Sequence, residues 1–113
     1  MKKATKQLKK AGWVVGNASE FLGLSPQEEA LIEIRLALGD EVRSSRKKAK
    51  LTQPALAKLI GSSQSRVAKV ETGDAAVSID LQLKALLAAG TKPSVVFSAL
   101  ARKLGPHKAA YAG

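Results

Sequence analysis

The chain has 113 residues, a formal net charge of +10 and 45% apolar residues, which suits one domain with one modest core. It contains no cysteine and a single histidine, His107, so disulfides, thiolate zinc sites and a histidine-based catalytic triad are excluded. Alanine, leucine and lysine dominate and aromatic residues make up 4%, which favours a small all-α domain over a sheet.

The first residues, 1–11, are rich in lysine and predict a mobile arm. No apolar run typical of a signal peptide follows them, and no stretch approaches the length of a membrane span. We therefore expect a soluble cytoplasmic protein without a membrane partner.

The next stretch, GWVVGNASEFLGLS, completes an expected N-terminal extension, residues 1–25. It is too apolar for a free linker, because it contains Trp13, Val15, Phe21 and Leu22. These side chains should pack on this domain, on a second copy or on another protein.

A long helix is predicted to begin after Ser25 and to run through Ala49. Ser25 can cap the free amides, Pro26 suits the first helical position and Glu28 can complete a capping box. One side carries Leu31, Ile34, Leu38, Val42 and Ala49, and a second apolar strip carries Ile32, Leu36 and Gly39. Both strips together are wider than a small core requires, so we expect the preceding segment or a partner to cover the second strip.

Four shorter helices are predicted after it, over residues 53–60, 64–72, 79–89 and 93–104. Thr52, Ser63 and Ser78 are placed to cap the first three of them, and glycine follows each helix end. The helical domain thus spans residues 26–104, and residues 105–113 are expected to form a flexible tail.

The helices at 53–60 and 64–72 share an apolar pattern. Leu56, Ala57 and Ile60 lie on one face of the first, and Val67 and Val70 lie on one face of the second. If the helices cross steeply at Gly61, these residues close a small core. The polar residues of the second helix then face outward, which is the layout of a helix-turn-helix whose second helix enters the DNA major groove.

The outward face of the second helix carries side chains that suit base edges. Gln64 can make paired hydrogen bonds to adenine, Ser65 can bond to several bases, and Lys69 can reach guanine or a phosphate. The free amides at the starts of both helices can bind phosphates. Nonspecific attraction is expected from Arg43, Lys47, Lys48, Lys50, Lys58 and Arg66.

The stretch LTQPALAKLIGSSQSRVAKVETG resembles the helix-turn-helix of the XRE group of bacterial and phage repressors, which are Cro/CI-like. The shared pattern is Leu-Thr-Gln, an Ala-x-x-hydrophobic-Gly step, Ser-Gln-Ser, and hydrophobic-x-x-hydrophobic-Glu-x-Gly. The resemblance implies a five-helix, lambda-repressor-like domain. It also implies a homodimer that binds a palindromic operator in double-stranded DNA, with half-sites about 34–36 Å apart.

The match also assigns roles to individual residues. It implies that Gln53 and Ser63 contact phosphate, while Gln64, Ser65 and Lys69 read bases. Two positions depart from the pattern. Ala55 stands where many members carry glutamate, and Arg66 stands where smaller residues are common, so Arg66 is expected to add a phosphate or base contact.

Glu71 ends the third helix, where the helix dipole disfavours a negative charge. It should therefore have a specific partner. The family pattern places Arg46 opposite it, so we expect an ion pair between the two side chains.

The small size, the N-terminal extension and the acidic start of the first helix are similar to XRE-type antitoxins of the HigA kind. These pair with a RelE/HigB-like ribonuclease toxin and repress their own operon. The resemblance implies that the segment from Trp13 to Leu36, with Ile32 on its helical part, holds a basic toxin.

Other functions remain open from the sequence. The chain can be a transcriptional regulator without a toxin, or a helical interaction module without a DNA role. A catalytic role is not expected, nor are a cofactor and a metal, because the necessary side chains are missing. A dimer can form through the fifth helix (Val95, Val96, Leu100) or through the Trp13 segment.

Overall fold

The structure of the chain is a computed structural model that describes residues 23–105. In this range it contains α3 (Pro26–Lys48), α4 (Gln53–Leu59), α5 (Gln64–Thr72), α6 (Ile79–Ala88) and α7 (Pro93–Leu104). No strand occurs among these residues, and the prediction of an all-α, five-helix fold is confirmed. Each helix begins at the predicted residue and ends within one residue of the predicted end.

Local side-chain contacts explain where the helices begin. Ser25 Oγ accepts from Glu28 N at 3.1 Å and Ser25 N donates to Glu28 Oε1 at 2.8 Å, which is a complete capping box. The side chains of Thr52, Ser63 and Ser78 cap α4, α5 and α6. α7 has no side-chain cap, and a proline in its first turn sets the helical φ instead.

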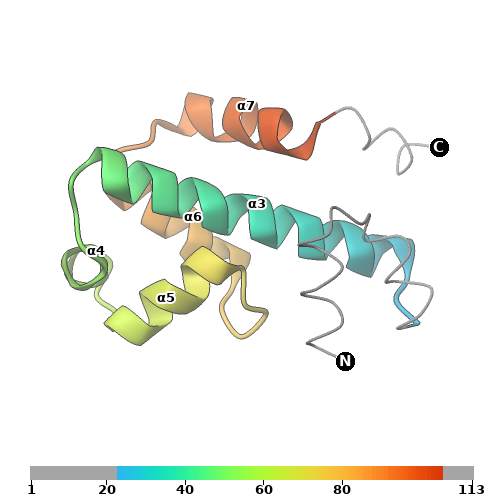
Figure 1. The fold of residues 1–113 in the computed structure, drawn as a ribbon, viewed down its shortest axis with the longest axis horizontal. Helices are drawn as coiled ribbons and strands as arrows, with labels where there is room; N and C mark the ends of the chain where they lie inside the picture. Colours follow the sequence, from blue (N-terminus) through green and yellow to red (C-terminus); the bar gives the residue numbers. More distant parts are fainter. Residues whose placement is uncertain (1–22, 106–113) are drawn as a thin grey trace.

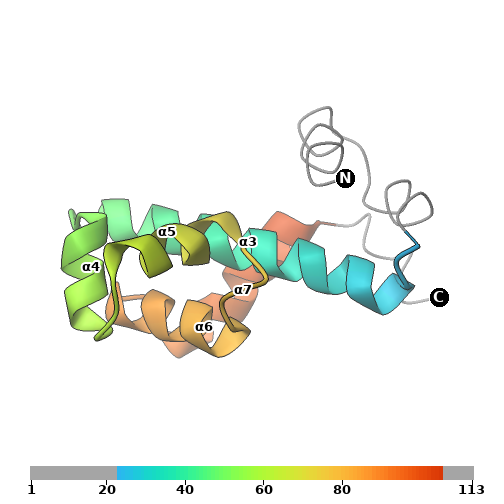
Figure 2. The same cartoon turned by 90° about the horizontal axis from the view of Figure 1, so that it is seen from below.

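α3 is the central helix, and it packs against α5, α6 and α7. α7 lies on one side of α3, and α4 and α5 lie on the other (Figure 1). The view from below shows that the N-terminal part of α3 projects beyond the other helices (Figure 2). The side of the molecule that carries α4 and α5 is therefore separate from the side that carries α7.

One apolar core joins all five helices. Its buried members are Leu38, Val42, Leu56, Ala57, Ile60, Val67, Val70, Val77, Ala85, Leu86, Ala89 and Val96. The expectation for the first apolar strip of α3 is partly wrong, because Leu31 is 45% exposed and Ala49 is exposed. Leu31 lies near the N-terminal end of α3 and Ala49 lies beyond its last turn, and neither belongs to this core.

Polar contacts hold α7 on α3. Ser45 and Thr91 share a hydrogen bond of 2.7 Å, and Lys103 Nζ lies 2.6 Å from Asp40 Oδ2. The hydrogen bond to Asp40 raises the pKa of Lys103 above its usual value, although partial burial opposes the shift.

Val96 is 3% exposed and belongs to the core, so its expected place on a dimer surface is wrong.

Several predictions concern residues outside the range 23–105 that the structure describes. Trp13, Val15, Phe21 and Leu22 lie outside the described residues, as do the lysine-rich arm and His107. Within residues 23–105, no helix is long and apolar enough to cross a bilayer.

Candidate nucleic-acid interface

The turn between α4 and α5 is short and depends on Gly61. This residue has φ of +63°, in the left-handed region that favours glycine. Ile60 ends α4, and Ser62 N donates to Ala57 O at 2.8 Å across the turn. The chain therefore reverses within a few residues, and α5 packs across α4 as a helix-turn-helix requires.

α5 divides into a buried side and an exposed side. Val67 and Val70 are 0% exposed and fix the helix to the core. The residues expected to read bases, Gln64, Ser65, Arg66 and Lys69, are all exposed. The structure thus brings these four side chains together on the outer surface of one short helix.

Ser63 starts α5 and is exposed at the same end. Its Oγ accepts from Arg66 N at 3.2 Å and lies 3.2 Å from Ser65 Oγ. This cap satisfies one of the free amides of the first turn and leaves the others directed outward. Free amides at a helix start favour a phosphate, which agrees with the phosphate contact expected for Ser63.

Gln53 links α4 to α5 through both ends of its carboxamide. Its Nε2 donates to Glu71 Oε1 at 3.0 Å, and its Oε1 lies 3.5 Å from Gln64 Nε2. The second contact is at the limit of a hydrogen bond and holds Gln64 weakly. One N–H of Gln53 serves Glu71, so a phosphate contact from this side chain would use its other N–H.

Glu71 is 4% exposed and is surrounded by donors. Arg46 Nε donates to Glu71 Oε2 at 2.5 Å and Arg46 Nη2 donates to Glu71 Oε1 at 3.2 Å, so the structure contains the expected ion pair. Arg46 Nη1 also donates to Leu51 O at 3.0 Å. The carboxylate therefore ties together the end of α3, the start of α4 and the end of α5.

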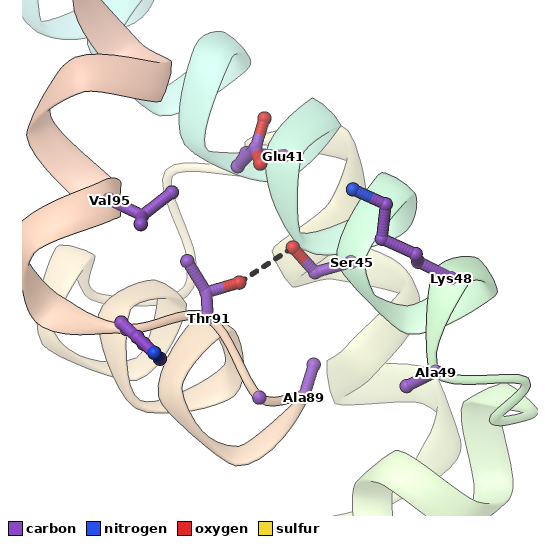
Figure 3. A pocket seen from close by; sticks show the side chains of 9 residues that line it. Glu41, Ser45, Lys48, Ala49, Ala89, Thr91 and Val95 are labelled. Atoms are coloured by element: carbon purple, nitrogen blue, oxygen red, sulfur yellow. Dashed lines mark hydrogen bonds between the residues drawn. The ribbon is translucent and has the colours of Figure 1, made fainter.

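The lysines expected to contact phosphate stand at the end of α3 or just after it. Lys47, Lys48 and Lys50 are exposed near the end of α3. Lys48 lines a groove with Ser45, Thr91 and other residues where α3 meets the start of α7 (Figure 3). That groove lies on the α7 side of α3, and the phosphate contact expected for Lys48 stays a prediction.

The sequence analysis missed one polar residue that lies beneath α5. Gln82 of α6 is 0% exposed, and its side chain bonds to main-chain carbonyl groups of α3 and α5. A sign of this role was visible, because Gln82 stands three residues after Ile79 and four before Leu86, on the apolar face of its helix.

Comparison with known proteins agrees with this geometry. A family model described as a helix-turn-helix domain matches residues 37–105, more than half of the chain. The match begins within α3 and continues through α7. No curated protein and no solved structure gave a match. The helix-turn-helix is a DNA-binding unit whose second helix contacts the bases. The chain therefore belongs to the helix-turn-helix domain family, and this domain is its DNA-binding part.

Proposed function

We propose that the chain is a transcriptional repressor that reads a palindromic operator as a homodimer. The observation that carries this proposal is the two-sided character of α5. Its valines are fully buried, while Gln64, Ser65, Arg66 and Lys69 are exposed together at the end that a helix-turn-helix directs into the major groove. In this proposal these four residues contact base edges, and phosphates are contacted by Ser63, Gln53, Lys47, Lys48 and Lys50.

The base-reading role is tested with Gln64→Ala on a duplex selected from random sequences by the wild-type protein. We expect binding to weaken by about 1–3 kcal/mol and the preference for one base to relax. Lys50→Ala should weaken binding to the selected and the scrambled duplex alike. It should also lower the slope of log affinity against log salt concentration by about 1. Fluorescence anisotropy at several salt concentrations measures both effects.

The matched control is Gln27→Ala, which removes an exposed glutamine at the far end of α3. It should leave affinity and base preference unchanged. Equal loss of affinity in the Gln27 and Gln64 variants would contradict base reading by α5, and a wild-type protein without salt-dependent DNA binding would contradict the proposed function itself.

We propose that the second copy docks on the exposed face of α7. Phe97 is 75% exposed, and exposed Ala101 and the half-buried Leu100 and Leu104 follow it at helical spacing to form an apolar strip. Leu100 also packs against the core. α7 and α5 lie on opposite sides of α3 (Figure 1). Pairing through α7 therefore leaves both copies of α5 uncovered, as binding to two half-sites requires.

A second candidate function is that of an antitoxin which represses its own operon. The observation that favours it is the start of α3, which precedes the family match at residue 37 and projects from the packed helices. This segment carries acidic residues, exposed Leu31 and half-buried Ile32 and Leu36. We propose that it contributes to a surface for a basic RelE/HigB-like ribonuclease toxin.

Co-expression with the neighbouring open reading frame tests the antitoxin role. We expect that frame to encode a small basic protein that co-purifies with the wild type and is lost from Ile32→Glu. Lys84→Ala, at an exposed position on α6 outside this segment, is the control and should retain the partner. A neighbouring protein that stays bound to both variants, or the absence of a toxin-like neighbour, would contradict this role.

We also propose that the chain is not an enzyme and acts in the cytoplasm. The support is compositional: the chain has no cysteine and one histidine. The described residues contain no cluster of three or more histidine, cysteine or acidic side chains that suits a metal ion.

A further inference from the structure

The C-terminal end of α5 touches α3 through main-chain atoms. A Cβ atom at Gly39 would lie 2.6 Å from Glu71 O and 2.7 Å from Val70 O. A Cβ atom at Gly73, which has φ of +71°, would lie 2.8 Å from Arg35 O. These distances are shorter than real contacts allow, so the two backbones meet at this crossing because two glycines leave out their side chains.

Gln82 bridges this crossing from α6. Its Nε2 donates to Arg35 O on α3 at 3.0 Å and to Val70 O on α5 at 3.1 Å. Both N–H groups of one carboxamide are therefore used, one on each side of the contact. The bonds are directional, so they fix the relative position of α3 and α5 in a way that apolar packing alone does not.

The same side chain is poorly suited to stabilising the fold. Gln82 is 0% exposed, and its Oε1 has no hydrogen-bond partner in the described structure. Burial of an unpaired acceptor is unfavourable and offsets much of what the two hydrogen bonds contribute. Methionine has a similar shape and no polar atom that requires a partner, so stability alone does not explain a glutamine here.

The position of this bridge matters for the exposed end of α5. Gln64 is six residues from Val70, which is about 9 Å along a helix. A rotation of α5 by about 3° at the crossing would move Gln64 by about 0.5 Å, which is the tolerance of a preorganised polar site. Small changes at Gln82 would therefore misplace the base-reading side chains.

We propose that Gln82 is a positioning residue that sets the orientation of α5 in the major groove and thereby the discrimination between base sequences. The proposal rests on the proposed function as a sequence-specific DNA-binding protein. In this proposal Gln82 affects the discrimination between base sequences without touching DNA itself.

The test compares Gln82→Met with Val96→Ala, which removes core volume from α7 on the other side of α3. Each protein binds two probes: a duplex selected from random sequences by the wild type, and a scrambled duplex of the same composition. The ratio of the two affinities measures specificity, and thermal unfolding measures stability.

For Gln82→Met we expect the specificity ratio to fall about tenfold, with unchanged binding to the scrambled duplex and a melting temperature within about 8 °C of wild type. Val96→Ala should lower the melting temperature and keep the ratio. Gln82→Leu serves as a second variant and should behave like Gln82→Met.

An unchanged ratio in a folded Gln82 variant would overturn the proposal and leave the proposed function intact. Failure of both Gln82 variants to fold would also overturn it, because Gln82 would then be needed for the fold itself. A wild-type ratio near one would overturn the sequence-specific function, and the positioning role with it.

Discussion

At the residue scale, Glu71 shows how a buried charge organises the interface. It lies at the C-terminal end of α5, where the helix dipole disfavours an anion, and it is 4% exposed. Two N–H groups of Arg46 and one of Gln53 compensate for this position. Arg46 is itself only 13% exposed, so the cost of burying each charge is offset by the opposite charge of its partner.

Glu71→Ala is therefore expected to destabilise the protein by about 3–5 kcal/mol, because it leaves the largely buried guanidinium of Arg46 without its carboxylate partner. Urea unfolding monitored by circular dichroism measures the change. Replacing both partners, Arg46→Met with Glu71→Leu, should recover a large part of this loss, since no unpaired charge remains. A double variant less stable than Glu71→Ala would contradict the mutual compensation.

At the element scale, the crossing of α3 and α5 explains why Gly39 lies within a long helix, where glycine is otherwise unfavourable. A Cβ atom there would meet main-chain oxygens of α5, which cannot move aside independently of the helix. The crossing is thus set by steric exclusion at Gly39 and by the hydrogen bonds of Gln82. Both features lie beneath α5, the helix that we propose reads the bases.

Gly39→Ala is expected to destabilise the protein by about 1–3 kcal/mol through overpacking. It should also weaken binding to the selected duplex, because α5 is pushed away from α3. Gly61→Ala is the control, since a Cβ atom there meets nothing within 4 Å and only the positive φ of +63° opposes it. That strain costs roughly 1–2 kcal/mol. Chemical denaturation of both variants measures the loss of stability, and fluorescence anisotropy on the same duplex measures the loss of affinity. Unchanged DNA binding by Gly39→Ala would contradict the proposed shift of α5 away from α3.

The elements also show what could be predicted from the sequence. The starts of α3, α4, α5 and α6 were predictable because Ser25, Thr52, Ser63 and Ser78 act on amides only three residues away. The role of Gly39 was not, because its neighbours Val70 and Glu71 are more than thirty residues away in sequence. The sequence placed Gly39 in an apolar strip with Ile32 and Leu36, whereas the structure buries it under α5 and leaves the other two half-buried.

The residues expected to read bases could be placed from the sequence more fully than the lysines expected to contact phosphate. Gln64, Ser65 and Lys69 could be placed together because they share a single helix, whose buried valines define the opposite side. Lys48 stands at the end of a long helix, and its direction depends on how that helix meets α7. The sequence alone therefore could not place Lys48 relative to α5.

At the scale of the whole molecule, the two sides of α3 suit different partners. α5 presents polar and basic groups on one side, and α7 presents an apolar strip centred on Phe97 on the other. A single α5 covers only one half-site of a palindrome, so operator binding benefits from a second copy held at a fixed distance. We propose that the apolar strip centred on Phe97 provides this contact between copies.

Phe97→Glu is therefore expected to convert a dimer into a monomer while the fold is retained, because Phe97 is 75% exposed and contributes little to the core. Light scattering coupled to size exclusion gives the mass, and thermal unfolding confirms the fold. Binding to a duplex with two half-sites should weaken far more than binding to one half-site, because only the linked copies gain from effective concentration. Ser98→Glu adds the same charge to an exposed neighbour outside the strip and should remain dimeric. A Phe97 variant that stays dimeric, or a wild type that is monomeric at the concentrations where it binds both half-sites, would place the contact between copies elsewhere on the molecule.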